Sequence, residues 1–445
     1  VSVEGDRIVA VGPGPAPVGG AVERIDARGG VVLPGLIDTH AHAGHGRTKG
    51  LGATSGDWMA TAGRVYAQAT DTNFWRAEAR LSALERLAGG VTTACLLMGG
   101  GPDVMMTAEP GPILAHAEGV ASIGVAEILA IGPNRPTGPR RYLDWSGGSP
   151  REIDTTPTAQ LAVAAQAARG SWPGLVRPAL SLPVFSAAEL DGDDADGAAA
   201  LCRAVLALAR DSGLLLVQDG HREGTLAAAE ATVGLGAAHA VFAHCIDLTE
   251  ADIAALRRSG AAVAHNPSAL MSVTGRCPAP ELIEAGVTVA LGSDAPAPDR
   301  SFDVFRNLFQ AHRLHARHFR DDTVLSCERL LRMATIDAAR ALGLGAEIGS
   351  LEPGKRADIV IVEWRAPHLW PPVDPFQRLT RFATAADVAT VVVGGRVRMR
   401  ERRFPDLDAD AILDEALTAY ATMLDRAGLA DLHAPLLPTC GVQTP

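Results

Sequence analysis

Two histidines lie one residue apart near the start of the chain, in the segment VVLPGLIDTHAHAGHG. Residues i and i+2 of a β-strand point to the same face, so His40 and His42 would project together. Two neutral imidazoles side by side suit a borderline divalent metal such as zinc. The pair follows an apolar run and a Pro-Gly step. This position at the end of an expected strand, more than the bare spacing, predicts a metal site.

Three further polar residues come directly after apolar runs. Asp294, in VTVALGSDAPAPDRSFD, could bind a metal, accept a proton from water and pass it to a leaving group, or it could cap the next helix. His244, in VFAHCIDLTEADI, could bind metal or polarise a substrate oxygen, or it could be structural. His265, in VAHNPSALMS, is a weaker candidate for contacting substrate.

Short β-branched runs that alternate with Ala/Leu/Arg-rich helical stretches must position these residues. The strands are expected to end near Thr39, Met98, Ile131, Phe185, Gln218, His244, His265 and Ser293, with helices over 73–88, 196–211, 224–234, 249–259 and 303–318. Eight such units over about 310 residues predict an α/β fold, a (β/α)8 TIM barrel with its active site at the carboxyl ends of the strands. Periodicity alone leaves an open doubly wound sheet as the alternative.

The two ends of the chain do not continue this alternation. Residues 1–30 and 346–400 contain short alternating strands with turn glycines, and we expect them to pair as a small β-sandwich domain. The metal-binding barrel would then span 31–345. Residues 401–445 would form a C-terminal helix and a tail.

The composition excludes several function classes. The chain has 445 residues, 47% of them hydrophobic and 20% charged, with a net charge of −11 and no basic tract, so a nucleic-acid partner is not expected. No apolar run reaches the roughly 18 residues of a membrane span. Six scattered cysteines predict buried thiols and a cytoplasmic location. A small-molecule or peptide substrate is expected, and a homodimer stays open.

In order and spacing, these segments resemble the amidohydrolase superfamily, in the branch of cytosine and guanine deaminases and triazine hydrolases. The matching text is GVVLPGLIDTHAH, LAGGVTTA, AHCIDLTEADIAALRRSGAAVAHNPSALMS, APELIEAGVTVALGSDAPAPDRSFD, ATIDAARALGL and IGSLEPGKRADIVIV. The resemblance covers nearly the whole chain except 133–215 and the tail. It implies a metal-bearing barrel with His40, His42 and Asp294 as ligands and Asp294 as proton shuttle. It also implies that His244 lies near the hydrolytic water or the scissile group.

The fifth strand departs from that pattern. Deaminases of this branch usually end it with His-x-x-Glu, a metal ligand and the acid that protonates the ring nitrogen. The text LLLVQDGHREGT places Gln218 at the histidine and His221 at the glutamate, with Glu223 shifted by two. We expect His221 to be the best replacement donor and a catalytic candidate, with His244 next and Gln218 poor. The missing acid weakens ring deamination in particular.

The chain has few lysines, and this scarcity limits the number of metal ions expected in the site. Binuclear members of the superfamily bridge two metals with a carboxylated lysine at the end of strand four. That strand, GLVRPALSLPVF, has none, and the chain contains only Lys49 and Lys355. One divalent metal is therefore expected, with zinc as the first choice, although nitrogen and oxygen ligands also accept iron, cobalt or manganese.

The favoured function is metal-dependent hydrolysis of an amide or amidine-like C–N bond by activated water, with Asp294 as proton shuttle. The altered strand five and the long loop at 133–172 fit a bulky substrate such as a peptide natural-product precursor of the bottromycin type. One alternative is an aminohydrolase or chlorohydrolase of a heteroaromatic ring such as a purine, pterin or triazine, with His221 or Glu223 as the acid. Another is a non-catalytic barrel used for binding or assembly.

Candidates for the substrate wall come from position alone. They are Arg47, Trp58 and Glu127, each of which could equally be structural. Arg135, Arg140 and Arg141 could meet an acidic substrate group or form a solvated loop face.

Overall fold

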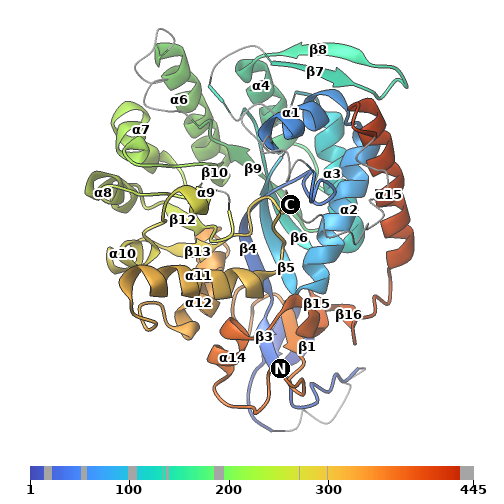
Figure 1. Ribbon diagram of the computed structural model, residues 1–445, viewed down its shortest axis with the longest axis vertical. Coiled ribbons are helices and arrows are strands. Elements are labelled where there is room, and N and C mark those ends of the chain that lie inside the picture. The colour runs from blue at the N-terminus through green and yellow to red at the C-terminus, as the bar shows by residue number, and fades with distance from the viewer. Residues whose placement is uncertain are drawn as a thin grey trace, which may run out of the picture.

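A computed structural model describes residues 1–14, 23–51, 58–98, 108–133, 135–136, 140–184, 195–269, 271–297 and 299–430. Its largest sheet has eight parallel strands in the spatial order β13-β12-β11-β10-β9-β6-β5-β4 (Figure 1). These strands are β4 (Leu36–His42), β5 (Val91–Leu97), β6 (Ala126–Ile131), β9 (Val176–Ser181), β10 (Leu216–Gln218), β11 (Ala240–Ala243), β12 (Ala262–His265) and β13 (Val289–Leu291).

The order of the strands in space is their order along the chain, which an open doubly wound sheet does not have. The two end strands, β13 and β4, lie side by side. Thr39 Oγ1 donates to Leu291 O at 2.6 Å, and Asp294 N donates to His40 O at 2.9 Å. The predicted (β/α)8 barrel is confirmed. Every residue of β4, β5 and β6 is buried, as expected for parallel strands covered by helices.

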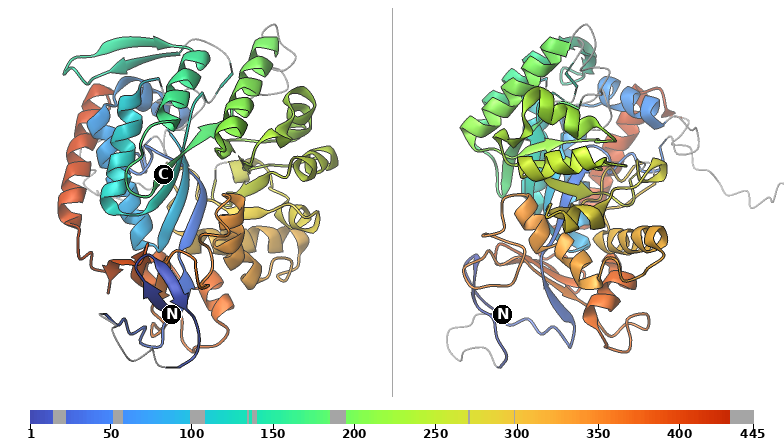
Figure 2. Two further views of the ribbon diagram at one scale, coloured as in Figure 1. Left: turned by 180° about the vertical axis from the view of Figure 1, so that it is seen from behind. Right: turned by 90° about the vertical axis from the view of Figure 1, so that its left-hand side faces the viewer.

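Helices cover the outside of the barrel and connect its strands (Figure 2). They are α1 (Trp58–Gln68), α2 (Thr72–Ala88), α3 (Pro110–Ile123), α4 (Pro157–Ala168), α6 (Ala195–Ser212), α7 (Thr225–Val233), α8 (Glu250–Ser259), α9 (Met271–Thr274), α10 (Ala279–Glu284), α11 (Val304–Phe319), α12 (Cys327–Met333) and α13 (Ile336–Ala341). The 3₁₀ turn η1 (Leu235–Ala237) follows α7. The cap of α11 is Asp303, whose carboxylate accepts from Phe305 N at 2.9 Å. Asp294 therefore does not cap this helix, which leaves its carboxylate available at the end of β13.

A small antiparallel sheet lies at one end of the molecule, and a hairpin formed by residues 140–155 lies at the opposite end (Figure 1). The order of the small sheet is β16-β15-β14-β3, from β3 (Val31–Pro34), β14 (Ile359–Val362), β15 (Val388–Val393) and β16 (Arg396–Arg400). Strands β1 (Ser2–Glu4) and β2 (Arg7–Ala10) form a separate pair. The expected single strand GGVVLPGLIDT is thus two strands, β3 and β4, divided at Gly35. A Cβ at Gly35 would collide with the side chain of Thr92.

The remaining elements lie beside the barrel and the small antiparallel sheet. Helix α14 (Pro375–Arg381) and the 3₁₀ turn η2 (Ala385–Asp387) lie between β14 and β15 in the chain. Helix α15 (Ala409–Arg426) runs beside α2 (Figure 1), and the tail beyond 430 falls outside the described residues. Among the described helices, none combines the length and apolar character that a membrane span requires.

The long segment after β6 contains an antiparallel hairpin, β7 (Arg140–Asp144) and β8 (Arg151–Thr155). Trp145, between the two strands, donates its Nε1 hydrogen to Gln68 O at 2.7 Å, which attaches the hairpin to α1. Arg141 is exposed and paired with Asp154 at 2.8 Å, so it belongs to a solvated face. The expected end of strand four at Phe185 lies outside the described residues, and β9 ends at Ser181.

Candidate metal centre

The structure brings four of the sequence-predicted residues to one place at the carboxyl ends of the strands. His40 and His42 end β4, His244 follows β11, and Asp294 follows β13. The ring centroid of His40 lies 5.0 Å from that of His42 and 5.3 Å from that of His244. Asp294 Oδ1 lies 3.2 Å from His42 Nε2 and 3.8 Å from His40 Nε2.

A fifth residue, Asp219, completes the cluster and was missed by the sequence analysis. It immediately follows β10. Its Oδ1 lies 3.5 Å from His40 Nε2 and 3.0 Å from His244 Nε2, and its Oδ2 lies 3.5 Å from His42 Nε2. In the sequence, the only sign that Asp219 belongs to the cluster is that this acidic residue directly follows an expected strand end. The His-x-x-Glu pattern falls on its neighbours Gln218 and His221 instead.

Those neighbours face other partners. His221 Nδ1 lies 3.0 Å from Thr225 Oγ1, and its Nε2 contacts Gln218 Oε1. Gln218 Nε2 donates to Pro183 O at 2.6 Å. Burial lowers the pKa of His221 to about 4. The structure therefore places Asp219 in the cluster, where the sequence analysis expected His221, because the side chains of Gln218 and His221 are bonded to each other and to their surroundings.

The donor atoms fit a divalent cation. Tetrahedral ligands about 2.1 Å from zinc lie roughly 3.4 Å from one another, close to the separations above. Burial lowers the pKa of His40, which favours the neutral imidazole that binds metals. Neither ring nitrogen of His40 makes a hydrogen bond of normal geometry within the described residues. Two candidate ligand sets emerge: His40, His244 and Asp294, and His40, His42 and Asp219.

The two carboxylates are ionised in this setting. Burial acts to raise the pKa of Asp219 and of Asp294, but the neighbouring imidazoles outweigh it and hold both well below the usual range. Arg300 also faces Asp294, with Nη1 3.8 Å from Oδ2. Asp294 is buried and Asp219 is partly exposed, and a divalent metal bound between the two carboxylates would add its positive charge to that of Arg300.

The backbone is held in an uncommon conformation at two of these residues. His244 has φ of 66° and Asp294 has φ of 61°, both in the left-handed region that non-glycine residues rarely adopt. Such conformations cost free energy and persist where the surroundings enforce them, often at functional sites. Here they turn both side chains toward the centre of the barrel mouth.

Two predicted substrate residues lie against structural partners instead. Glu127 Oε1 is 2.8 Å from Nε2 of His116, which belongs to α3 on the outside of the barrel. Arg47 donates from Nη1 to Phe74 O at 3.3 Å and from Nη2 to Ala416 O, so it joins α2 to α15. Both are buried, and neither contacts the cluster among the described interactions.

The other two predicted substrate residues, His265 and Trp58, have different surroundings. His265 Nε2 lies 3.2 Å from Nε2 of His315 in α11, a contact between two buried rings. Trp58 lies nearer the cluster, since its ring centroid is 5.5 Å from that of His45, which in turn is 5.7 Å from that of His42. Trp58 therefore remains a substrate-wall candidate. Of the loop arginines, the side chain of Arg140 lies outside the described residues.

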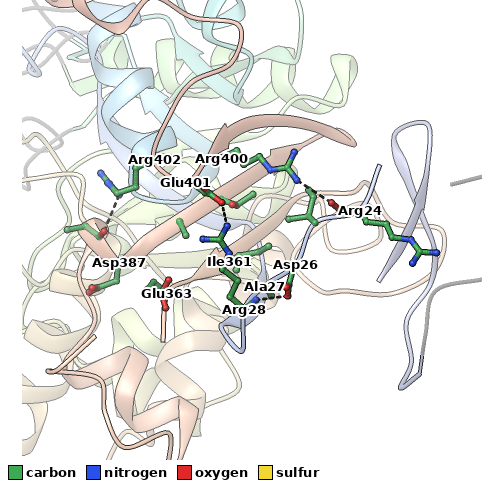
Figure 3. Close-up of a pocket in the computed structure, with 14 residues that line it drawn as sticks. Arg24, Asp26, Ala27, Arg28, Ile361, Glu363, Asp387, Arg400, Glu401 and Arg402 are labelled. Carbon is green, nitrogen blue, oxygen red and sulfur yellow. Dashed lines mark hydrogen bonds and ion pairs between the residues drawn. The ribbon is translucent and has the colours of Figure 1, made fainter. Parts of the chain in front are cut away.

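A hollow of about 420 Å³ occurs elsewhere, on the small sheet (Figure 3). Two of its arginines have acidic partners, since Arg28 pairs with Glu401 and Arg400 Nη1 lies 2.7 Å from Glu23 Oε1. Arg402 Nη1 donates to Val388 O at 3.0 Å. It belongs to the sheet formed by the chain ends, and it contains none of the clustered histidines. This hollow is therefore separate from the candidate metal centre.

Comparison with known proteins agrees with this architecture. The model of the amidohydrolase family matches residues 215–398. A 5-methylthioadenosine/S-adenosylhomocysteine deaminase of Syntrophobacter fumaroxidans is 31% identical over 426 residues, which cover 93% of this chain and 91% of that protein. The chain belongs to the amidohydrolase family. A 5'-deoxyadenosine deaminase of Methanosarcina mazei is 28% identical over 417 residues, covering 90% and 88% of the two chains.

Solved structures show the same fold. A zinc-bound adenosine deaminase from Xanthomonas campestris superposes with a TM-score of 0.72 at 22% identity, covering 88% of this chain and 86% of that one. A zinc complex of atrazine chlorohydrolase from Arthrobacter aurescens gives 0.74 at 23% identity, covering 94% of each. As an amidohydrolase, the protein is a hydrolase that acts on C–N bonds, which argues against a non-catalytic barrel. These relatives and structures lend no support to a peptide precursor as substrate.

Proposed function

We propose that this amidohydrolase is an aminohydrolase that removes the exocyclic amino group of a purine, with adenosine-type nucleosides as the substrate class. The observation that carries the proposal is the convergence of His40, His42, His244 and Asp294 at the barrel mouth. The substrate class is supported by relatives named as deaminases of adenosine derivatives, matched over about nine-tenths of the chain.

We propose that the cluster holds one divalent metal, zinc in the first instance. Zinc is present in two structures of the same fold. Neither lysine reaches the cluster: Lys49 pairs with Glu85, and Lys355 Nζ donates to Gly345 O at 2.7 Å. A bridging carboxylated lysine for a second metal is therefore absent among the described residues.

The bound metal would lower the pKa of a water molecule toward 7. Asp294 would accept the proton of the attacking water and return it to the departing amine, because its carboxylate is ionised and directed at the cluster. His244 would hydrogen-bond the attacking oxygen or the reacting carbon's substituent. Asn266 Nδ2 lies 3.4 Å from His244 Nδ1 and would orient the imidazole ring of His244.

A second candidate follows from the fifth strand. Gln218 and His221 occupy the positions of the usual ligand and of the usual acid, respectively, and they are bonded to each other. A substrate whose leaving group departs without protonation of a ring nitrogen, such as an open-chain amidine or a chlorotriazine, needs no such acid. This observation keeps hydrolysis of these compounds as the alternative.

The test is a substrate panel with metal-loaded enzyme. Ammonia release is measured with adenosine, 5'-deoxyadenosine, 5'-methylthioadenosine, an acyclic amidine and a chlorotriazine, the last also for chloride. We expect ammonia from at least one adenine nucleoside. The Asp294→Asn variant should lose about 10²- to 10⁴-fold in kcat, while Asp299→Asn, an exposed acid in the same loop, should be unaffected. Turnover confined to the amidine or the chlorotriazine would contradict the proposal.

A further inference from the structure

We infer that Asp219 is a metal ligand that replaces the usual strand-five histidine and shifts the centre toward harder divalent cations. The difference in affinity between zinc and manganese(II) would then be smaller than in a site formed mainly by histidines. The inference rests on the proposed metal-dependent function and concerns the metal that the same cluster binds.

Asp219 and Asp294 stand in the same relation to the His40–His42 pair. Asp294 Oδ1 lies 3.2 Å and 3.8 Å from the two Nε2 atoms, and the oxygens of Asp219 lie 3.5 Å from each. Asp219 also completes one of the two candidate ligand sets, together with His40 and His42.

In the described part of the chain, every hydrogen bond and ion pair of the Asp219 side chain goes to the imidazoles of His40, His42 and His244. No arginine, lysine or backbone N–H engages it there. A carboxylate used for structure would ordinarily bind such donors, as Asp252 does with the N–H groups of Gly224 and Ala227. Asp219 therefore has no evident structural task.

Carboxylate oxygens suit manganese and magnesium, whereas imidazole nitrogens suit zinc, copper and iron. Zinc still binds more tightly than manganese, as the general order of divalent affinities requires. The second carboxylate reduces the difference between them.

The test is a pair of metal titrations on the metal-free full-length protein. Zn²⁺ and Mn²⁺ are titrated in competition with a chromophoric chelator for the wild type, Asp219→Asn, Asp219→His and Glu223→Gln. Glu223 is an exposed acid in the same loop and serves as the matched control. Circular dichroism checks that each variant is folded.

Asp219→Asn should weaken both metals by about 10- to 100-fold or more, the range typical even for groups that only orient ligands. Asp219→His should recover zinc affinity but not manganese affinity, so that the ratio of the two dissociation constants rises about tenfold. The visible spectrum of the Co²⁺-loaded protein should also differ between wild type and Asp219→His. Glu223→Gln should match the wild type in every measurement.

Unchanged affinities for both metals in Asp219→Asn, with an unchanged ratio in Asp219→His, would overturn the inference and leave Asp219 as a partner of protonated histidines. The titrations need no turnover. Metal binding without deamination would therefore contradict only the proposed function. Deamination with unaltered metal affinity in Asp219→Asn would contradict only the role of Asp219.

Discussion

Asp38, in the first strand of the barrel, binds Ser293 at the end of the last strand through both of its carboxylate oxygens. Its Oδ1 accepts from Ser293 N at 2.8 Å, and its Oδ2 accepts from Ser293 Oγ at 2.6 Å. Arg86 Nε approaches the same Oδ2 at 3.4 Å, and its guanidinium stacks 3.6 Å from the centroid of the Phe302 ring. Asp38 thereby holds the residue before Asp294 against the strand that carries His40 and His42.

Asp38→Asn should destabilise the fold and loosen the metal centre together. Asp38 and Arg86 are both buried, at 1% and 2% exposed, so the variant leaves a buried cation without its counter-charge. Breaking a buried ion pair in this way costs about 3–5 kcal/mol in the free energy of unfolding, measurable by urea denaturation. Asp6→Asn is the control, since the Asp6 side chain is 60% exposed. Equal stability of the two variants would contradict the prediction.

Gly292→Ala should disturb His40 directly. A Cβ at this position would lie 2.8 Å from His40 O and 2.9 Å from His40 Cβ, and it would also collide with Asn266 Oδ1. Because these are backbone and ligand atoms with no room to move, we expect metal affinity to fall by about tenfold or more. Gly63→Ala in α1, where a Cβ meets nothing within 4 Å, should bind metal normally and be slightly more stable.

Glu127→Gln should show a stability loss that depends on pH. Burial opposes the charge on His116, but Glu127 outweighs it and raises the pKa of His116. The charged pair therefore stabilises the fold below the unfolded pKa of about 6.5, and this contribution is lost as the pH rises through the raised value. Urea denaturation should show a deficit of about 3–5 kcal/mol at pH 6 that shrinks at pH 9. A constant deficit would show that His116 is not charged.

The same variant separates structure from substrate binding. Glu127 contacts α3 and not the cluster, so metal-loaded Glu127→Gln should keep its KM at pH 8. A large rise in KM without loss of stability would return Glu127 to the substrate wall.

His315→Phe should make the protein less sensitive to acid. Burial lowers the pKa of His315 to about 4, so the folded state resists protonation that the unfolded chain accepts below about 6.5. The contribution of neutral His315 to the free energy of unfolding is therefore fully present above about pH 6.5, and it is lost as the pH falls from there toward about 4. The wild type should lose roughly 2 kcal/mol from this group between pH 8 and pH 5. The variant should lose less, whereas His318→Gln, an exposed histidine of the same helix, should behave as the wild type does.

The sequence by itself determined the alternation of parallel strands and helices, and it indicated four of the five clustered residues. Near-continuous apolar runs that alternate with helices are typical of a covered parallel sheet, and the carboxyl ends of such strands meet at one mouth. His40, His42, His244 and Asp294 directly end or follow those runs, so their convergence needed only the strand order. The two-residue repeat of a strand also placed both members of the His40–His42 pair on one face.

Only the tertiary structure decided the direction of side chains beyond the strand ends. Asp219 points into the cluster while Gln218 and His221 bind each other, because the loop backbone after β10 sets these directions and no local pattern encodes it. Glu127 likewise occupies a barrel strand, yet its partner His116 comes from the neighbouring helix. Residue types and spacing thus indicate where chemistry occurs. The packing of distant segments determines which side chains take part in it.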